Sequence, residues 1–275
     1  PDDAGSSDGQ DSQPDPEPSG DDGIRVETDA SRVPATRTGG DVVIRNATVL
    51  TMAPAGVLEQ TDVLIRDGLI AQIGSDLRVP DGTVVVDATD AWVMPGIIDD
   101  HSHMASDGGI NEGTLSITAQ VRIEDVLHGD DLTLYRAAAG GVTTANVLHG
   151  SANTIGGQRA IIQMKYGVPA TELQFDDYPR GIKFALGENV TRRRNRFPNT
   201  RMGQEAVIRR ALTEAQVYQA QWDDYEAEVR QADRRVAPPR RDLRLETLAG
   251  IREESVEAVV SATTANANRF YALEP

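Results

Sequence analysis

The sequence contains no cysteine, so the chain can hold no disulfide, no thiolate metal site and no cysteine nucleophile. Any metal that it binds must therefore be held by nitrogen and oxygen ligands. No stretch approaches the roughly 18 consecutive apolar residues that a membrane-spanning helix needs. The sequence therefore predicts a protein with no membrane span.

Positive charge is also scarce. The chain has 27 Lys and Arg residues against 43 Asp and Glu residues, which gives a formal net charge of -16. Nearly all of the positive charge is arginine, because Lys165 and Lys183 are the only lysines. A strongly acidic protein repels phosphate backbones, so the charge balance argues against a nucleic-acid partner.

The chain divides into three parts of different composition. Its 275 residues, 39% hydrophobic and 25% charged, suit a soluble globular protein that could form one large domain or a barrel with a smaller partner. Residues 1–22 carry eight acidic and no basic side chains, a composition that cannot offset the entropy of ordering. Residues 1–40 are therefore predicted to be a disordered acidic tail. The first residue is Pro1 rather than Met, which indicates a removed leader or a fragment boundary.

Residues 41–94 are rich in β-strand signals. Alternation of apolar and polar residues at period two predicts short strands at 42–45, 48–52, 62–66, 69–73, 83–87 and 92–94. Asp67 and Gly68 stand between the third and fourth runs and tolerate the positive φ of a two-residue hairpin turn. This pattern predicts a small antiparallel unit.

From residue 95 to residue 275, strands alternate with helices. The pattern predicts a buried strand at 97–99, a helix that starts after Asp130 or Asp131 and ends at Gly140, and a strand at 142–148. A strand, a helix and a strand in succession predict parallel pairing, so the fold class is α/β. A third strand is expected at 181–186, and helices at 202–235, 243–251 and 255–271. The stripe of Tyr218, Trp222 and Tyr225 is expected to pack within the long helix rather than bind a ligand.

Two histidines carry the clearest chemical signal. His101 and His103 follow the apolar run Ile97-Ile98. Residues two apart on a strand point to the same face, so the two imidazoles should lie side by side. Paired neutral imidazoles suit a divalent ion such as zinc, and the end of a parallel barrel strand is where catalytic groups lie. The spacing predicts a chelating pair.

This element, at residues 95–103, resembles the corresponding segment of the amidohydrolase superfamily, in particular its imidazolonepropionase-like branch of secreted or periplasmic enzymes. The resemblance runs from about residue 41 to residue 251, and further motifs stand at 139–144, 148–153 with 156–158, and 182–189. It implies a (β/α)8 TIM-like barrel, a β-sandwich built partly from residues 41–94, and one or two divalent metal ions, zinc being expected. It also implies an extracellular or periplasmic location, with a cytoplasmic one as the alternative.

The resemblance implies hydrolysis of a carbon–nitrogen bond other than a peptide bond, in a cyclic amide or imidazolone-like substrate. The metal would lower the pKa of bound water to about 7 and so activate it as the nucleophile. The superfamily adds a carboxylate or a carbamylated lysine from a middle strand. Lys183 and Glu188 are the two candidates, and Glu188 is preferred because it follows the expected strand end. The alternatives are a packing lysine and a solvated turn residue.

Three polar residues are candidates for substrate binding: His149, Asn153 and Gln158. His149 closes the second barrel strand, and the other two lie in the Gly-rich loop that follows. Each has a structural alternative, since such side chains commonly bond to the backbone of their own loop. His128 is expected at the surface. The arginines at 192–194 and 196 are expected in a solvated loop, with binding of an anionic substrate as the alternative.

The later part of the superfamily site is missing. The four histidines are His101, His103, His128 and His149, so no later residue can supply the two further imidazoles that the superfamily uses. Residues 95–275 are also fewer than the roughly 250 of a typical eight-unit barrel. The prediction is therefore an incomplete (β/α)8 barrel, containing the first strands only, in a truncated or chimeric chain. Residues 253–271 resemble the C-terminal helix of TatD-type metal-dependent hydrolases.

Two functional hypotheses remain open. One is a metal-dependent amidohydrolase with His101, His103 and Glu188 as metal ligands. The other is an inactive fragment, or a partner-binding pseudo-enzyme, that lacks the later ligands. An unclosed parallel sheet would expose strand edges, which an oligomer or a missing C-terminal portion would cover.

Overall fold

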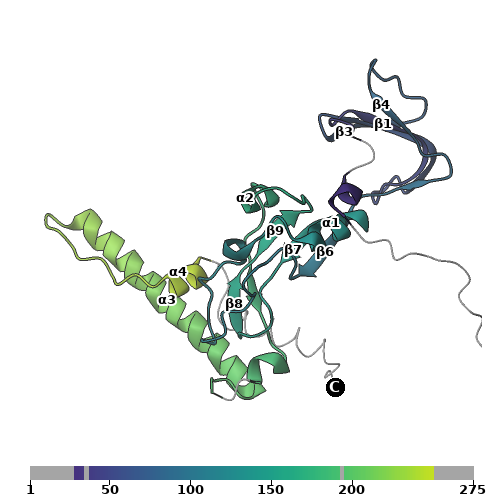
Figure 1. Cartoon of the computed structure of the whole chain (residues 1–275). Coiled ribbons are helices and arrows are strands. Elements are labelled where there is room, and N and C mark those ends of the chain that lie inside the picture. Colours follow the sequence, from purple (N-terminus) through teal and green to yellow (C-terminus); the bar gives the residue numbers. More distant parts are fainter. Residues whose placement is uncertain (1–27, 34–36, 193–194, 251–275) are drawn as a thin grey trace, which may run out of the picture. The chain divides into compact units, whose positions relative to one another are not determined.

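A computed structural model describes residues 28–33, 37–192 and 195–250. Most of the predicted acidic tail and the whole TatD-like segment lie outside this part of the chain. The described residues form a mixed α/β structure, which confirms the predicted fold class (Figure 1). They divide into two compact units: one contains the described residues up to Ile44 together with Asp62–Val86, and the other contains Arg45–Thr61 together with the described residues from Asp87 onward. Among the described helices, none has the length and apolar character needed to cross a membrane.

Five strands form the first sheet. They are β1 (Val42–Leu50), β2 (Val57–Arg66), β3 (Leu69–Gly74), β4 (Val84–Asp87) and β5 (Trp92–Val93). The order is β3-β2-β1-β4, and β5 pairs in parallel with β1. Asp67 and Gly68 join β2 to β3 with φ values of 52° and 76°, as the hairpin prediction requires. The two strands predicted at 42–45 and 48–52 are one continuous strand.

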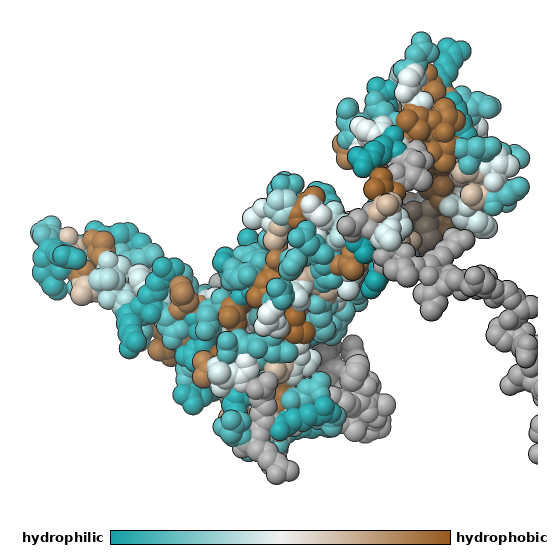
Figure 2. All heavy atoms as spheres, in the orientation of Figure 1, coloured by the Kyte–Doolittle hydropathy of each residue, from teal (hydrophilic) through white to brown (hydrophobic). Residues whose placement is uncertain are grey.

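One face of this region has a small apolar core, whereas several apolar residues remain exposed. Val43, Leu64 and Leu77 are buried together. Leu69, Ile70 and Val85 are all more than half exposed. Figure 2 shows apolar surface over this β-rich region. The strands described here therefore form a single sheet, and the second layer of the expected β-sandwich is not among them.

The strand, helix and strand predicted after residue 95 are present as β6 (Ile97–Ser102), α1 (Leu132–Ala139) and β7 (Val142–Val147). β6 and β7 pair in parallel, which confirms the predicted connection. The Asp131 carboxylate caps α1 by accepting from the Thr133 amide at 2.9 Å, and Gly140 ends the helix. The same carboxylate accepts from the Ala105 amide at 2.8 Å. Asp131 thereby fixes the loop after β6 to the start of α1.

The strands that follow differ from the predicted barrel. β8 (Ile155–Gln158) and β9 (Ala160–Gln163) were not expected, and β9 pairs antiparallel to β7. β10 (Ile182–Phe184) pairs antiparallel to β8, rather than serving as a third parallel strand. Within the described residues, β6 and β7 are the barrel-like parallel pair.

The exposure of the β6 side chains differs from the predicted buried strand. Ile97 and Ile98 were predicted to lie in a buried strand, but Ile98 is 68% exposed. The sheet order is β6-β7-β9, so β6 has a neighbour on one side among the described strands. Side chains project from the faces of a sheet rather than from its edge, so the exposure of Ile97 and Ile98 shows that the described residues leave these faces uncovered.

Three helices complete the described chain: α2 (Ala170–Leu173), α3 (Arg201–Gln231) and α4 (Leu243–Ala249). The Thr200 hydroxyl caps α3 by accepting from the Gly203 amide. The buried residues of α3 lie between Gly203 and Tyr218, and Ala211 and Ala215 pack with Ile155 and Leu248. α3 ends at Gln231, four residues before the predicted end at Arg235. The rings of Tyr218, Trp222 and Tyr225 meet edge to face along the helix, with centroids 6.2 and 5.7 Å apart.

Candidate metal and substrate site

β6 brings the two predicted metal ligands together. The ring centroids of His101 and His103 lie 5.3 Å apart with their planes at 88°. The Nδ1 atom of His103 lies 2.8 Å from the carbonyl oxygen of Leu148, just after β7. Since a carbonyl can only accept, Nδ1 carries a hydrogen, and in the neutral form of the ring Nε2 has the lone pair. His103 therefore presents a free donor atom.

Lys183 lies directly beside this pair. Its Nζ atom, from the middle of β10, is 2.9 Å from Nε2 of His101. Burial lowers the pKa of the Lys183 amine from its ordinary value. Burial, followed by the positive charges of Lys183 and His103, also lowers the pKa of His101. Both shifts favour the neutral forms, which are the forms that donate a lone pair to a metal.

Glu188, the preferred third ligand, lies elsewhere. It begins a 3-10 helix (Glu188–Thr191), its side chain is 75% exposed, and its carboxylate pairs with Arg192. Across the described part of the chain, no three His, Asp or Glu residues gather as they would around a metal ion. The predicted trio of His101, His103 and Glu188 is therefore not assembled. The basic side chain at position 183 stands against His101 instead.

His149 is buried behind the site. Only 6% of the residue is exposed, and its Nε2 atom has no hydrogen-bond partner among the described residues. The backbone of Gly157 fits against the ring so closely that an added Cβ would lie 2.1 Å from Nε2. Burial, with Lys183 and His103 adding positive charge nearby, lowers the pKa of His149. The imidazole is thus held neutral at a buried position.

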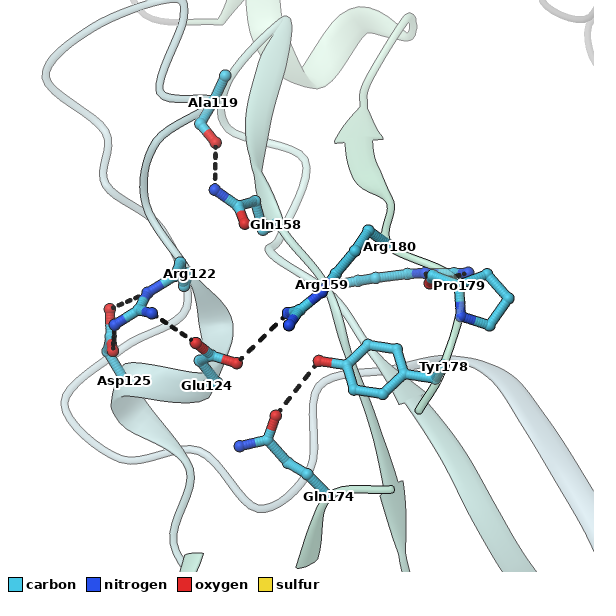
Figure 3. A network of polar contacts seen from close by, with 10 residues as sticks. All are labelled: Ala119, Arg122, Glu124, Asp125, Gln158, Arg159, Gln174, Tyr178, Pro179 and Arg180. Atoms are coloured by element: carbon cyan, nitrogen blue, oxygen red, sulfur yellow. Dashed lines mark hydrogen bonds and ion pairs between the residues drawn. The ribbon is translucent and has the colours of Figure 1, made fainter. Parts of the chain in front are cut away.

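The amides of Asn153 and Gln158 serve the loops around them. Asn153 is buried, and its Nδ2 donates to the carbonyls of Glu112 and Leu115 and to the Thr118 hydroxyl. The Gln158 Nε2 donates to the Ala119 carbonyl at 3.3 Å, as Figure 3 shows. Neither residue is among those that line the cavity described below. These contacts favour the structural alternative for both.

The other predicted residues also have local roles. His128 accepts a hydrogen bond from the Asp130 amide at its Nδ1. Arg196 donates to the carbonyls of Gly113, at 2.6 Å, and Leu115, at 2.8 Å, and so holds a loop in place. Positions 193 and 194 lie outside the described residues. Of the predicted basic cluster, Arg192 therefore contacts Glu188 and Arg196 contacts backbone carbonyls.

A cavity of about 620 Å³ opens beside the histidine and the lysine. His101 and Lys183 line it together with Asn146, Ser151 and Arg159, and this volume suits a small organic molecule. The Asn146 Nδ2 donates to the Asp100 carbonyl at 3.0 Å, while its Oδ1 is buried with no partner in the described structure. Neither Asn146 nor Arg159 was predicted from the sequence as a site residue. The available signal for Asn146 was an amide between the apolar residues Ala145 and Val147, near the end of the predicted strand.

The nitrogen atoms of His101, His103 and Lys183 are of the type that binds a divalent metal ion. His103 offers an unprotonated Nε2, and His101 and Lys183 offer two further nitrogens 2.9 Å apart. Such nitrogen donors suit zinc. A carboxylate partner is missing from this group in the described residues. Lys183 is the side chain placed to complete the set.

The chain is similar to several known proteins, although no family model matches it. Over 223 residues it is 30% identical to the amidohydrolase tasK of Hapsidospora irregularis, an alignment that covers 68% of this chain and 23% of tasK. Over 55 residues it is 49% identical to the dihydroorotase of Mycobacterium tuberculosis, covering 20% of this chain and 13% of that enzyme.

Among solved structures, the chain resembles an amidohydrolase from Thermotoga maritima MSB8 with a TM-score of 0.68 and 28% sequence identity. The superposition covers 82% of this chain and 62% of that one. The chain thus spans less than two thirds of the length of each of these relatives.

Proposed function

Because the chain belongs to the amidohydrolase superfamily, we propose that it provides the metal-binding part of a hydrolase that cleaves carbon–nitrogen bonds other than peptide bonds. The proposed substrate is a small cyclic amide or an imidazolone-like compound. One observation carries the proposal: His101 and Lys183 line a cavity large enough for such a molecule, and His103 lies beside His101.

In this proposal, the histidines bind the metal and Lys183 completes the ligand set. His101 and His103 hold one or two divalent ions, with zinc expected, and the Leu148 carbonyl fixes the tautomer of His103. When bound, the ion supplies Lewis acidity, which lowers the pKa of water and polarises a carbonyl oxygen. Lys183 adds a third ligand. In its neutral form the amine can take up CO2, forming an N–C bond and releasing a proton, which converts it to an anionic carbamate.

Asn146 has a separate role in the proposal. Its Nδ2 is tied to the backbone of β6, and its unpartnered Oδ1 stands at a residue that lines the cavity. A buried acceptor without a partner is costly unless a ligand satisfies it. We assign Asn146 to orienting the N–H group of the substrate amide.

One finding favours the alternative of an inactive or partner-binding chain. Within the described residues, no carboxylate joins the two histidines, so the metal set is complete only if Lys183 acts as a ligand. Metal binding by the chain therefore decides between the two readings. An extracellular or periplasmic location stays part of the proposal.

The test is metal content with and without the histidine pair. The full-length protein, loaded with zinc and desalted, should retain about one or two ions by plasma mass spectrometry and hydrolyse a member of a cyclic-amide panel. The variant H101A with H103A should lose the metal and at least about 1,000-fold of the activity, because both imidazoles are ligands. His128→Ala is the matched histidine control and should keep both. Retention of metal by the double variant would refute the proposal.

A further inference from the structure

Arg159 is a permanently charged residue in the cavity wall, and its position is tightly defined. It stands between β8 and β9, and its backbone amide donates to the Gly181 carbonyl at 3.0 Å. Its Nε and Nη2 atoms donate to the Pro179 carbonyl at 3.2 and 2.8 Å (Figure 3). A Cβ at Gly181 would lie 2.7 Å from Nε, so a glycine is needed where the side chain passes. Among the described residues, the guanidinium is held in place by a backbone carbonyl and no charged partner.

Neighbouring arginines differ from Arg159 in this respect. Arg122 pairs with Glu124 at 2.8 Å and with Asp125 at 2.7 Å. Arg180 lies 4.0 Å from Glu124 and stacks over the Tyr178 ring, 5.3 Å from its centroid. In the described structure, Arg159 has the Pro179 carbonyl but no carboxylate as a partner. A guanidinium has five N–H donors, so most of its hydrogen-bonding capacity is unused.

The cavity itself is positive, although the protein is strongly acidic. Arg159 supplies this charge whatever the protonation state of Lys183, and none of the described lining residues is Asp or Glu. The chain as a whole carries a net charge of -16. A cleft with the opposite sign to the rest of the protein concentrates ligands of matching charge, here anions. The planar guanidinium fork suits a carboxylate in particular.

We propose that Arg159 binds a carboxylate of the substrate, so that the substrate class is a small amide carrying a carboxylate group. The reaction in this inference rests on the proposed hydrolase function, whereas the anion site rests on the cavity alone. Arg159 packs on Gly181, which is two residues from Lys183 along the same extended segment. Two residues of a strand span about 7 Å. The carboxylate therefore lies a few bonds from the scissile amide.

The experiment compares two probes that differ in one charge, N-acetylglycine and N-acetylglycinamide, by calorimetric titration of the full-length protein with and without zinc. The unmodified protein should bind N-acetylglycine at least about ten-fold more tightly, since a charged hydrogen-bonded pair is lost with the neutral probe. R159M should weaken N-acetylglycine about ten- to hundred-fold and leave N-acetylglycinamide unchanged. R159K should retain part of the preference. R180M, a neighbouring arginine outside the cavity, should retain all of it.

The outcomes separate the two proposals. If the charge preference depends on Arg159 but no cyclic amide is hydrolysed, the anion site stands and the hydrolase function fails. If hydrolysis occurs while R159M keeps the preference, the substrate class proposed here is wrong. Equal binding of both probes, or binding of neither at millimolar concentration, overturns it as well. Unchanged affinity of R159M for the neutral probe, with an unchanged melting curve, shows that the variant is folded.

Discussion

Basic side chains in the wall of the cavity and in the segment that follows it differ in their partners. Lys183 and Arg159 in the wall have neutral partners, an imidazole nitrogen and a backbone carbonyl. Five residues beyond Lys183, Glu188 is exposed and paired with Arg192. α3 continues this outer pattern, with Glu205 pairing Arg209 one turn along. The candidate site is therefore distinguished by partly buried basic side chains that lack a carboxylate partner in the described structure. Charged side chains by themselves occur throughout the exposed surface.

The sharpest test of this difference replaces one charge from each side. Lys183→Met should reduce zinc-dependent hydrolysis at least about 100-fold and weaken zinc binding, because it removes the nitrogen beside His101. Glu188→Gln should change either quantity by less than about three-fold, since an exposed pair with Arg192 contributes little. Metal titration and initial rates measure both. A larger loss in the Glu188 variant would reverse the comparison and restore the ligand set predicted from sequence.

A second test addresses the packing behind the wall. Gly157→Ala should lower the free energy of unfolding by about 1–3 kcal/mol, because its Cβ would meet the His149 ring and the Val121 carbonyl. Gly140→Ala, at the end of α1, is the matched control: its Cβ would have ordinary contacts, the nearest at 3.4 Å. We expect the control to stay within about 0.5 kcal/mol of the parent. Urea denaturation measures both, and equal effects would show that the wall is no more tightly packed than the helix end.

The smallest expected effect concerns pH. Burial lowers the pKa of His149, so the folded state binds fewer protons than the unfolded state below the ordinary histidine pKa of 6.5. Stability should therefore be complete above pH 6.5 and fall as the pH drops through and below that value. One such group contributes at most about 1.4 kcal/mol per pH unit.

His149→Asn should flatten the acid side of the stability curve, whereas His128→Asn, at a partly exposed position, should leave it in place. Urea midpoints between pH 7 and pH 5 provide the measurement. An identical slope in the parent and the His149 variant would mean that the buried ring is not the source of the acid sensitivity.

The sequence predicted what depends on local spacing. The pairing of His101 with His103 follows from the two-residue period of a strand, and the parallel pair β6 and β7 follows from the helix between them. Membership of the amidohydrolase superfamily is likewise confirmed. The barrel beyond this pair, the imidazolonepropionase-like branch and the location of the protein stay predictions.

What the sequence could not predict depends on contacts between distant segments. Glu188 was preferred because ligands follow parallel strands, but β10 runs antiparallel to β8, and Lys183 in its middle reaches His101. β8 was missed because its two glycines weaken the strand signal. Arg159 and Asn146 belong to no motif. Their place in the cavity follows from the packing of β7, β8 and β10, which no short-range pattern encodes.

The C-terminal part of α3, residues 219–231, suits modification of this chain. No residue from 219 to 231 is buried, and its polar groups bond along the helix, as Gln219 does with Asp223 at 2.9 Å. Such i to i+4 contacts sustain a helix without help from a core. An affinity peptide or a fluorescent reporter inserted after Gln231 would therefore leave the cavity chemistry untouched, since exposed connections accept insertions most readily.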